Sequence, residues 1–460
     1  MKKELGQEAI YDARELGVPR MLVLGLQHLF AMFGATVLVP ILVQGYGLPL
    51  SIQTTLLMAG LGTLLFHVCT KMKVPAFLGS SFAYLGGFAA VASLDAGKYA
   101  TMSPDDKLAY ALGGIVIAGL LYLVLALLFK VLGAWKVMRY FPPIVTGPMI
   151  IMIGLNLAGS AIGNASRCWW LALVAIAIII VANIWGKGMV KIIPILLGVV
   201  GAYIIALIAN AFGATALDAQ GNVVPLLDFS AVASANIVGL QPITIAKFDL
   251  TSILVMAPIA IAAMMEHIGD ISAISSTTGN NFISDPGLHR TLVGDGLATA
   301  LAGFFGGPAN TTYGENTGVL ALSRVYDPRV IRLAAVYAII LSFSPMFDAL
   351  VNSIPAAIVG GISFILYGMI SAVGVRNIVE NRVDLTKSRN LIIAAVMFVS
   401  GLGFSSTGGL TFMVGDAAVT LTGLAIAALA GVLLNAVLPG NDYEFGATEN
   451  ADKAADLGTY

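Results

Sequence analysis

The sequence has 460 residues, of which 58% are hydrophobic and only 11% are charged. A soluble domain carries about 25% charged residues, so this composition excludes a soluble enzyme, a disordered chain and a nucleic-acid-binding protein. The 24 basic residues are balanced by 25 acidic ones, and the net charge of −1 provides no basic field for phosphates. Because a helix needs about 20 apolar residues to cross a bilayer, we expect an all-α polytopic protein of the lipid bilayer.

Fourteen apolar stretches, separated by polar connections, follow one another along the chain. The third and the tenth are short and begin with Pro, Gly and Ser or Thr residues, which membrane helices tolerate better than soluble ones. The predicted transmembrane segments are 21–44, 50–70, 76–93, 108–129, 140–162, 168–185, 190–211, 252–271, 291–306, 312–324, 332–347, 350–373, 390–404 and 415–438.

The basic residues test the number of segments and their orientation. With the N-terminus in the cytoplasm, alternating connections place 20 of the 24 lysine and arginine residues on the cytoplasmic side. One missed segment would invert every later connection, so this asymmetry supports an even number of segments with both termini inside. The first 20 residues lack the pattern of a signal peptide. We predict a cytoplasmic N-terminal segment at 1–20, a membrane unit at 21–438 and a cytoplasmic tail at 439–460.

The longest polar interruption, at about 212–250, divides the fourteen segments into two sets of seven. An odd number of segments inverts the second set relative to the first. In each half the short segment follows two complete ones. Inverted repeats with a broken helix at matching positions are typical of secondary transporters, which bind their substrate near the midplane of the bilayer.

Four acidic residues lie inside apolar segments: Glu266, Asp270, Asp295 and Glu315. An intramembrane charge costs about 2.5–3.5 kcal/mol even on the mildest scale, and we expect no lysine or arginine in the hydrocarbon region to offset it. Burial disfavours the charged form of a carboxyl group, so these residues are candidates to take up and release protons. Glu266 and Asp270 are four residues apart and share one helix face. The alternative for any one of them is a hydrogen bond to a neighbouring helix.

The motifs of membrane enzymes and pumps are absent from the sequence. It contains no HExxH, no GxSxG and no P-loop. Its two cysteines are too few for a disulfide framework or a zinc site. We therefore expect no enzyme, no metal and no cofactor. We interpret His28 and His267 as packing residues rather than ligands.

The openings of the third and tenth segments carry the polar residues of a binding site. Pro75–Phe82 and Asn310–Asn316 combine glycines with hydroxyl and aromatic side chains. Two broken helices that meet at mid-membrane expose N–H groups to carbonyl oxygens or anions. Phe82 and Tyr313 add aromatic faces. Backbone donors, carboxylate acceptors and flat rings fit a planar heterocycle with an alternating acceptor–donor–acceptor edge, such as the imide of a uracil-like base.

Several of these residues also resemble a known family. Glu315–Arg324 resembles the signature of the nucleobase–ascorbate transporter family, which is an acidic or amide residue, Asn, any residue, Gly, four more residues, Thr and usually a basic residue. Ser323 replaces the threonine and keeps its hydroxyl. Gln27–His28, Phe77–Ala83 and Asp285–Arg290 resemble further motifs of the family. The resemblance extends over nearly the whole chain.

The resemblance implies a fold of fourteen transmembrane segments in two inverted seven-segment repeats, with short antiparallel strands in segments 3 and 10. It implies a core domain at about 21–130 and 252–347, and a gate domain at about 139–211 and 350–438. Dimerisation through the gate domain is a further expectation from the family. The substrate-binding residues expected from the motifs and the resemblance are Glu266, Glu315, Phe82, Tyr313, Ser81 and Gly314.

The implied function is the import of uracil with protons across the inner, or cytoplasmic, membrane, with Asp270 and Asp295 as candidate proton carriers. Glu315 resembles the uracil-transporting members, because purine-transporting relatives usually have Gln at this position. Asp270 departs from several uracil-transporting members, which have His there. A xanthine or purine permease of the same family therefore remains the alternative. A proton or ion channel, the alternative from another class, would need a continuous polar stripe, whereas the polar residues here lie at one depth.

Overall fold

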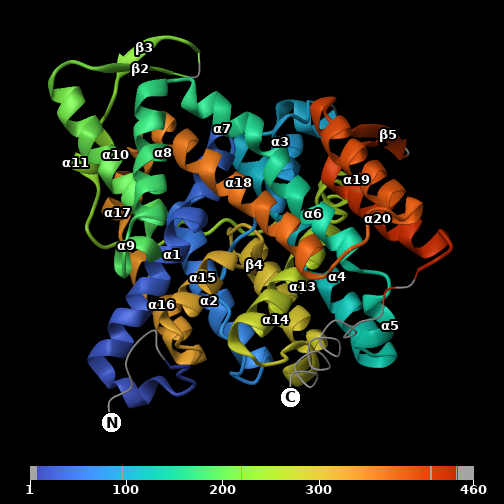
Figure 1. Ribbon diagram of the computed structural model, residues 1–460. Coiled ribbons are helices and arrows are strands. Elements are labelled where there is room, and N and C mark those ends of the chain that lie inside the picture. The colour runs from blue at the N-terminus through green and yellow to red at the C-terminus, as the bar shows by residue number, and fades with distance from the viewer. Residues whose placement is uncertain (1–7, 96, 219, 415–416, 442, 444–460) are drawn as a thin grey trace.

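Helices make up most of the structure, a computed structural model that describes residues 8–95, 97–218, 220–414, 417–441 and 443. The predicted N-terminal segment is therefore described from residue 8 onward. Of the predicted tail, only residues 439–441 and 443 are among the described residues. Figure 1 shows the helices packed side by side as a bundle.

Prolines and capping hydroxyls begin many helices of the first half. Pro104, Pro143 and Pro194 each occupy the first helical position, where a missing N–H breaks no intrahelical bond. The Ser51 hydroxyl accepts a hydrogen bond from the Thr54 N–H and caps the second helix. The helices of this half are α1 (Val18–Gly45), α2 (Ile52–Cys69), α3 (Leu85–Ala92), α4 (Pro104–Leu132), α5 (Ala134–Met138), α6 (Pro143–Asn156), α7 (Ala158–Ala165), α8 (Trp169–Ile184), α9 (Met189–Ile192) and α10 (Pro194–Ala211).

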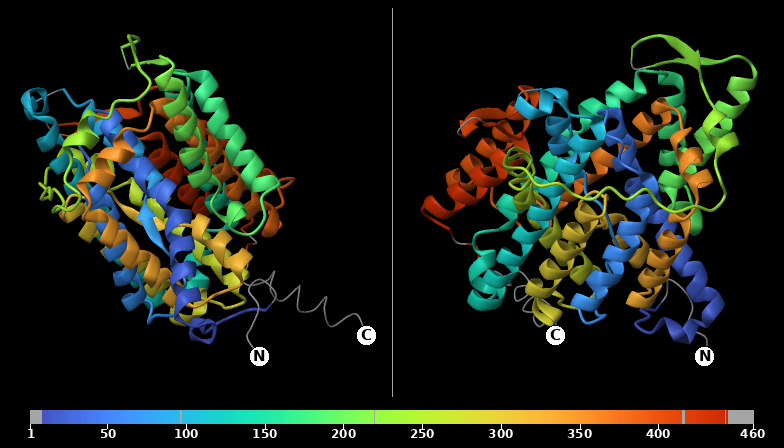
Figure 2. Two further views of the ribbon diagram at one scale, coloured as in Figure 1. Left: turned by 90° about the vertical axis from the view of Figure 1, so that its left-hand side faces the viewer. Right: turned by 180° about the vertical axis from the view of Figure 1, so that it is seen from behind.

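The polar connection between the halves lies along the outside of the bundle (Figure 2). It contains the antiparallel hairpin of β2 (Thr215–Leu217) and β3 (Val223–Pro225) and the short helix α11 (Ser230–Ser234). Backbone hydrogen bonds then attach it to the bundle, from the Ala246 N–H to the Phe304 carbonyl at 3.2 Å and from the Lys247 N–H to the Ala109 carbonyl at 2.9 Å.

The second half repeats the helical character of the first. Its helices are α12 (Leu250–Met256), α13 (Ile259–Thr278), α14 (Leu288–Phe304), α15 (Gly314–Ser323), α16 (Pro328–Ser342), α17 (Pro345–Asn352), α18 (Ala356–Glu380), α19 (Ser388–Ser406) and α20 (Gly423–Val437). Among the described residues, eight helical stretches of the two halves are long and apolar enough to cross a bilayer, or nine if the bent pair α16–α17 counts as one. The chain is therefore a multi-pass membrane protein. The other predicted segments contain shorter helices, such as α3 with 8 residues and α15 with 10.

Two predicted boundaries are wrong. The boundary between segments 332–347 and 350–373 is wrong. The chain bends by 90° between α16 and α17, inside the first of these segments, and α18 begins only after Pro355. The last predicted segment begins at 415, but α20 begins at Gly423. The residues before it form β6 (Ala417–Leu421), which pairs with β5 (Leu410–Val414) in an antiparallel hairpin. Valine and threonine favour such strands, and an apolar count alone cannot distinguish the strand from the start of a helix.

The helices pack in two groups. In one group α14 packs against α4 and α2, and α16 packs against α2 and α1. In the other group α18 packs against α6, α7 and α8, α10 packs against α8, and α19 packs against α20. The long helix α13 contacts members of both groups, among them α4, α6 and α20. A binding site on α13 therefore lies where the two groups meet.

Two short strands, one from each half, pair in the interior. β1 (Leu78–Ser80) and β4 (Asn310–Thr312) are antiparallel, with Gly79 opposite Thr311. β1 is followed by a 3₁₀ turn (Phe82–Tyr84) and α3, whereas β4 is followed by α15. Each strand therefore leads into a short helix that begins inside the protein.

Candidate functional site

Buried hydroxyl groups hold the β1–β4 pair in place. The Thr63 hydroxyl accepts from the Leu78 N–H at 2.9 Å and lies 3.2 Å from the Leu78 carbonyl oxygen. The Thr299 hydroxyl donates to the Asn310 carbonyl at 2.9 Å. A two-stranded ribbon leaves outer backbone groups unpaired, and a buried unpaired group is costly. These threonines satisfy such groups from α2 and α14, which fixes the strands relative to both helices.

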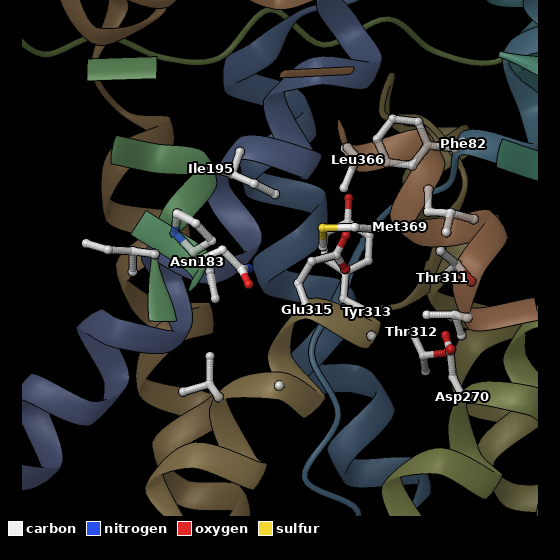
Figure 3. A pocket seen from close by; sticks show the side chains of 18 of the residues that line it. Phe82, Asn183, Ile195, Asp270, Thr311, Thr312, Tyr313, Glu315, Leu366 and Met369 are labelled. Atoms are coloured by element: carbon white, nitrogen blue, oxygen red, sulfur yellow. The ribbon is translucent and has the colours of Figure 1, made fainter. Parts of the chain in front are cut away.

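A cavity of about 290 Å³ lies beside this ribbon (Figure 3). Its volume is at the lower end of the roughly 300–1,000 Å³ typical of small-molecule sites. Polar or aromatic residues that line it are Phe30, Phe82, Asn183, Lys191, Glu266, Asp270, Thr311, Thr312, Tyr313 and Glu315. Apolar side chains, including Ile195, Leu366 and Met369, make up much of the remaining wall. The cavity therefore suits a small, flat molecule with a few polar atoms.

Glu266 and Glu315 reach this cavity from different helices. Glu266 lies in the middle of α13, and its Oε2 atom is buried without a hydrogen-bond partner among the described residues. Glu315 is the second residue of α15, and the Tyr313 side chain at the N-cap does not cap that helix. The Glu315 carboxyl group interacts with the N–H of its own residue in the first turn of α15, and Gly314 lines the cavity wall beside it. Carboxylate acceptors and backbone donors are brought together here.

Asp270 lines the same cavity one helical turn after Glu266. Its Oδ2 atom accepts a hydrogen bond of 2.8 Å from the Thr312 hydroxyl, which lies at the end of β4. Figure 3 shows the two side chains next to each other at one side of the cavity. The strand therefore orients Asp270, and any change of charge on this carboxyl group acts directly on the ribbon.

The ring of Tyr313 is fixed by contacts with β1 and α1. Its hydroxyl donates to the Ser80 carbonyl at 2.9 Å and lies 3.2 Å from the Ser80 hydroxyl and 3.4 Å from the Thr36 hydroxyl. Gly79 is required beneath this ring, because a Cβ atom there would collide with the Tyr313 ring. Across the cavity wall, Phe82 packs edge-on against Tyr367 of α18, with ring centroids 5.8 Å apart. Two aromatic residues thus border the space from different elements.

Two of the expected site residues lie outside the cavity lining. Ser81 is fully buried, and its hydroxyl has no partner among the described residues. Asp295 of α14 is also fully buried, and its Oδ2 atom lies 3.0 Å from His267 Nδ1. The predicted packing role of His267 did not include this pair, because the two residues are 28 positions apart on different helices. Asp295 is thus paired with a histidine and does not line the cavity.

Four polar residues of the cavity are not among the individually predicted site residues. Thr311 is buried, and its hydroxyl has no partner among the described residues, although it lines the cavity. Thr312 holds Asp270. Asn183 and Lys191 come from α8 and α9, which the motifs do not include. The threonines could have been found from their place beside Glu315, whereas no local signal distinguishes Asn183 or Lys191. Within the described ranges, no group of three or more His, Cys, Asp or Glu residues could hold a metal ion.

Comparison with known proteins finds a matching family and similar relatives. The model of a permease family, described as "Permease family", matches residues 19–408. The uracil permease of Bacillus caldolyticus is 42% identical over 438 residues, which cover 92% of this chain and 93% of that protein. The uracil permease of Bacillus subtilis is 39% identical over 430 residues, which cover 90% and 91%.

Solved structures support the fold. The transmembrane domain of a cyanobacterium bicarbonate transporter, BicA, aligns with a TM-score of 0.62 at 16% identity, covering 93% of this chain and 99% of that one. The anion transporter SLC26A9 aligns with a TM-score of 0.63 at 11% identity, covering 93% and 66%. At these identities the likeness concerns the fold alone. On the family model and the similar relatives, this chain belongs to the permease family whose motifs it shares, the nucleobase–ascorbate transporters.

Proposed function

We propose that this chain is a proton-coupled secondary transporter that imports uracil across the cytoplasmic membrane by alternating access. The observation that carries the proposal is the placement of Glu266, Glu315 and the N-terminus of α15 on one small cavity. Two relatives that match more than nine-tenths of their own length are named uracil permeases, which supports the choice of base.

The chemistry of the cavity matches the edge of a uracil ring. Uracil presents N–H donors next to carbonyl acceptors in one plane. Each carboxylate of Glu266 and Glu315 accepts an N–H, and a charge-assisted bond of this kind is stronger than a neutral one. An N–H group at the start of α15 donates to a ring carbonyl. Phe82 and Tyr313 border the space for the ring itself. We assign Gly314 to the backbone contact, and Ser81 to support of the turn that carries Phe82.

The fold proposed for this function has fourteen transmembrane segments in two inverted repeats of seven, in which the β1–β4 ribbon connects the third and tenth. The first packing group of helices corresponds to the core domain, at about 21–130 and 252–347. The second corresponds to the gate domain, at about 139–211 and 350–438. Homodimerisation through the gate domain completes the proposed assembly in the lipid bilayer.

The cavity defines the state of the transporter in this proposal. Its wall includes Lys191, which the distribution of basic residues assigns to the cytoplasmic side together with both termini. A separate cavity, lined in part by Tyr46, Arg167 and Asp218, shares no lining residue with it. We infer that the substrate cavity faces the cytoplasm and that the separate cavity is the closed outer entrance. Alternating access then exchanges the two openings around a fixed site.

Two carboxyl groups are candidates for the coupled proton. Asp270 lies on the cavity wall and is held by Thr312. Asp295 lies behind the wall against His267. We favour Asp270, because it lines the space in which the base binds and therefore senses whether the base is present. Protonation from outside and release to the cytoplasm would then accompany each base.

Uptake of radiolabelled uracil into proteoliposomes tests the proposal. We expect concentrative uptake when the outside is acidic, loss of concentration when a protonophore is added, and competition by unlabelled uracil but not by xanthine or guanine. Stronger competition by xanthine than by uracil would show a purine permease instead. Uptake that does not depend on the proton gradient would contradict proton coupling but would not contradict uracil as the substrate.

A further inference from the structure

The substrate cavity has polar groups on its gate-domain side that the proposed site does not use. Asn183 lies in the last turn of α8 and Lys191 in α9, and both line the cavity. Neither side chain has a hydrogen-bond or ion-pair partner among the described residues. Figure 3 shows Asn183 across the cavity from Asp270 and Thr312. A half-buried amide without a partner, directed at a cavity, is available for a ligand.

The surroundings separate these groups from the carboxyl groups of the core domain. Ile195, Leu366 and Met369 contribute apolar side chains to the same wall. Lys191 is the one basic side chain in the described lining, which otherwise carries only acidic ionisable groups and a tyrosine. The cavity therefore has an acceptor-rich side on the core domain and a donor-bearing side on the gate domain.

An amide next to an ammonium group suits the same class of ligand, a pyrimidine base, as the proposed site at Glu266 and Glu315. A carboxamide presents one acceptor and two donors in a plane, so it pairs with the adjacent N–H and C=O of a pyrimidine ring through two hydrogen bonds. A lysine ammonium has three donors and no acceptor, so it suits the second ring carbonyl. A purely anionic ligand would need the lysine but would gain nothing from the amide acceptor.

We infer that Asn183 and Lys191 form an inner subsite that binds the imide edge of the base after it leaves Glu266 and Glu315. The inference rests on the proposed function. Because the subsite belongs to the gate domain and the carboxyl groups to the core domain, the base meets it only when the cavity opens toward Lys191. The subsite therefore affects binding from the cytoplasmic face and not from the outer face.

Membrane vesicles of the two orientations test the subsite. The half-saturating concentration of uracil is measured in inside-out and right-side-out vesicles for the wild type, Asn183→Ala and Lys191→Gln. Loss of a neutral hydrogen bond in Asn183→Ala weakens binding roughly three- to tenfold, and loss of the charged donor in Lys191→Gln weakens it about tenfold or more. We expect that increase in inside-out vesicles alone, with the outer-face value unchanged within twofold. Lys187→Gln is the matched control, since Lys187 is exposed nearby and does not line the cavity.

The outcomes separate the subsite from the function. A wild type that transports no uracil overturns both. A wild type that transports uracil, with both variants unchanged at the cytoplasmic face, overturns the subsite alone. Equal weakening at both faces also overturns it, because a general effect on the fold does not distinguish the faces. Lys191→Gln changes an exposed side chain and keeps the test valid if Asn183→Ala fails to fold.

Discussion

Replacing Glu315 with Gln changes one oxygen of the proposed site into an NH₂ group and leaves the size of the side chain nearly unchanged. Glu315 lines the cavity as the second residue of α15. If its carboxylate accepts an N–H of uracil, the variant loses a charged hydrogen bond worth about 1.5–3 kcal/mol. That loss corresponds to roughly a ten- to hundredfold weaker binding constant. The new NH₂ group could also face a donor of the base, which adds to the loss.

Equilibrium binding of radiolabelled uracil to the purified variant measures this effect. A second contribution concerns stability, because a negative charge in the first turn of a helix stabilises it by about 0.3–1 kcal/mol. Thermal unfolding therefore accompanies the binding measurement, and we expect only a small decrease in the melting temperature. Glu380→Gln is the control, since Glu380 is exposed on α18 and pairs with Arg376 at 3.5 Å. Unchanged uracil affinity in Glu315→Gln would remove Glu315 from the site and refute the reasoning.

Three further changes test the proton, the motion and the ribbon. Asp270→Asn mimics the protonated carboxyl but cannot release a proton, so we expect uracil binding and exchange without concentrative uptake. If only Asp295→Asn abolishes accumulation, Asp295 carries the coupled proton instead. A Cβ atom on Gly86 would lie 4.0 Å from Thr422 Cγ2, so cysteines at these two positions should cross-link the proposed core and gate domains. We expect the cross-link to stop transport but not binding. Transport that persists after complete cross-linking contradicts rigid-body motion at that boundary. Gly79→Ala places a methyl group against the tyrosine ring before α15, so we expect weaker uracil binding in a folded protein, and binding at wild-type strength would show that the ring tolerates displacement.

The elements that could be predicted from sequence are those with a strong local signal. Charges in apolar segments are costly and therefore conspicuous, so the sequence alone points to Glu266, Asp270 and Glu315, which all line the cavity. Most long apolar stretches were also found as helices. Local signals were ambiguous for β6 and for the bend between α16 and α17, because mean apolarity describes helix and strand alike.

The missed features depend on contacts between distant residues. The Thr312–Asp270 bond joins residues 42 positions apart, and the contact of His267 with Asp295 joins different helices. Asn183 looks like any polar residue near the end of an apolar helix until the fold places it opposite the carboxyl groups. These contacts arise from the packing of distant segments, so they cannot be predicted from the composition of the chain or from the spacing of its residues.

The β1–β4 ribbon also sets an order of assembly during synthesis. Ser80 pairs with Asn310, so 230 residues must be added before the first strand has a partner. At about 5–20 residues per second, that interval lasts roughly 10 to 50 seconds. During it the backbone groups of β1 that face β4 have no strand to bond, and lipid cannot satisfy them. The ribosome therefore delivers an incomplete N-terminal half, and the binding site forms only when the second half inserts beside it.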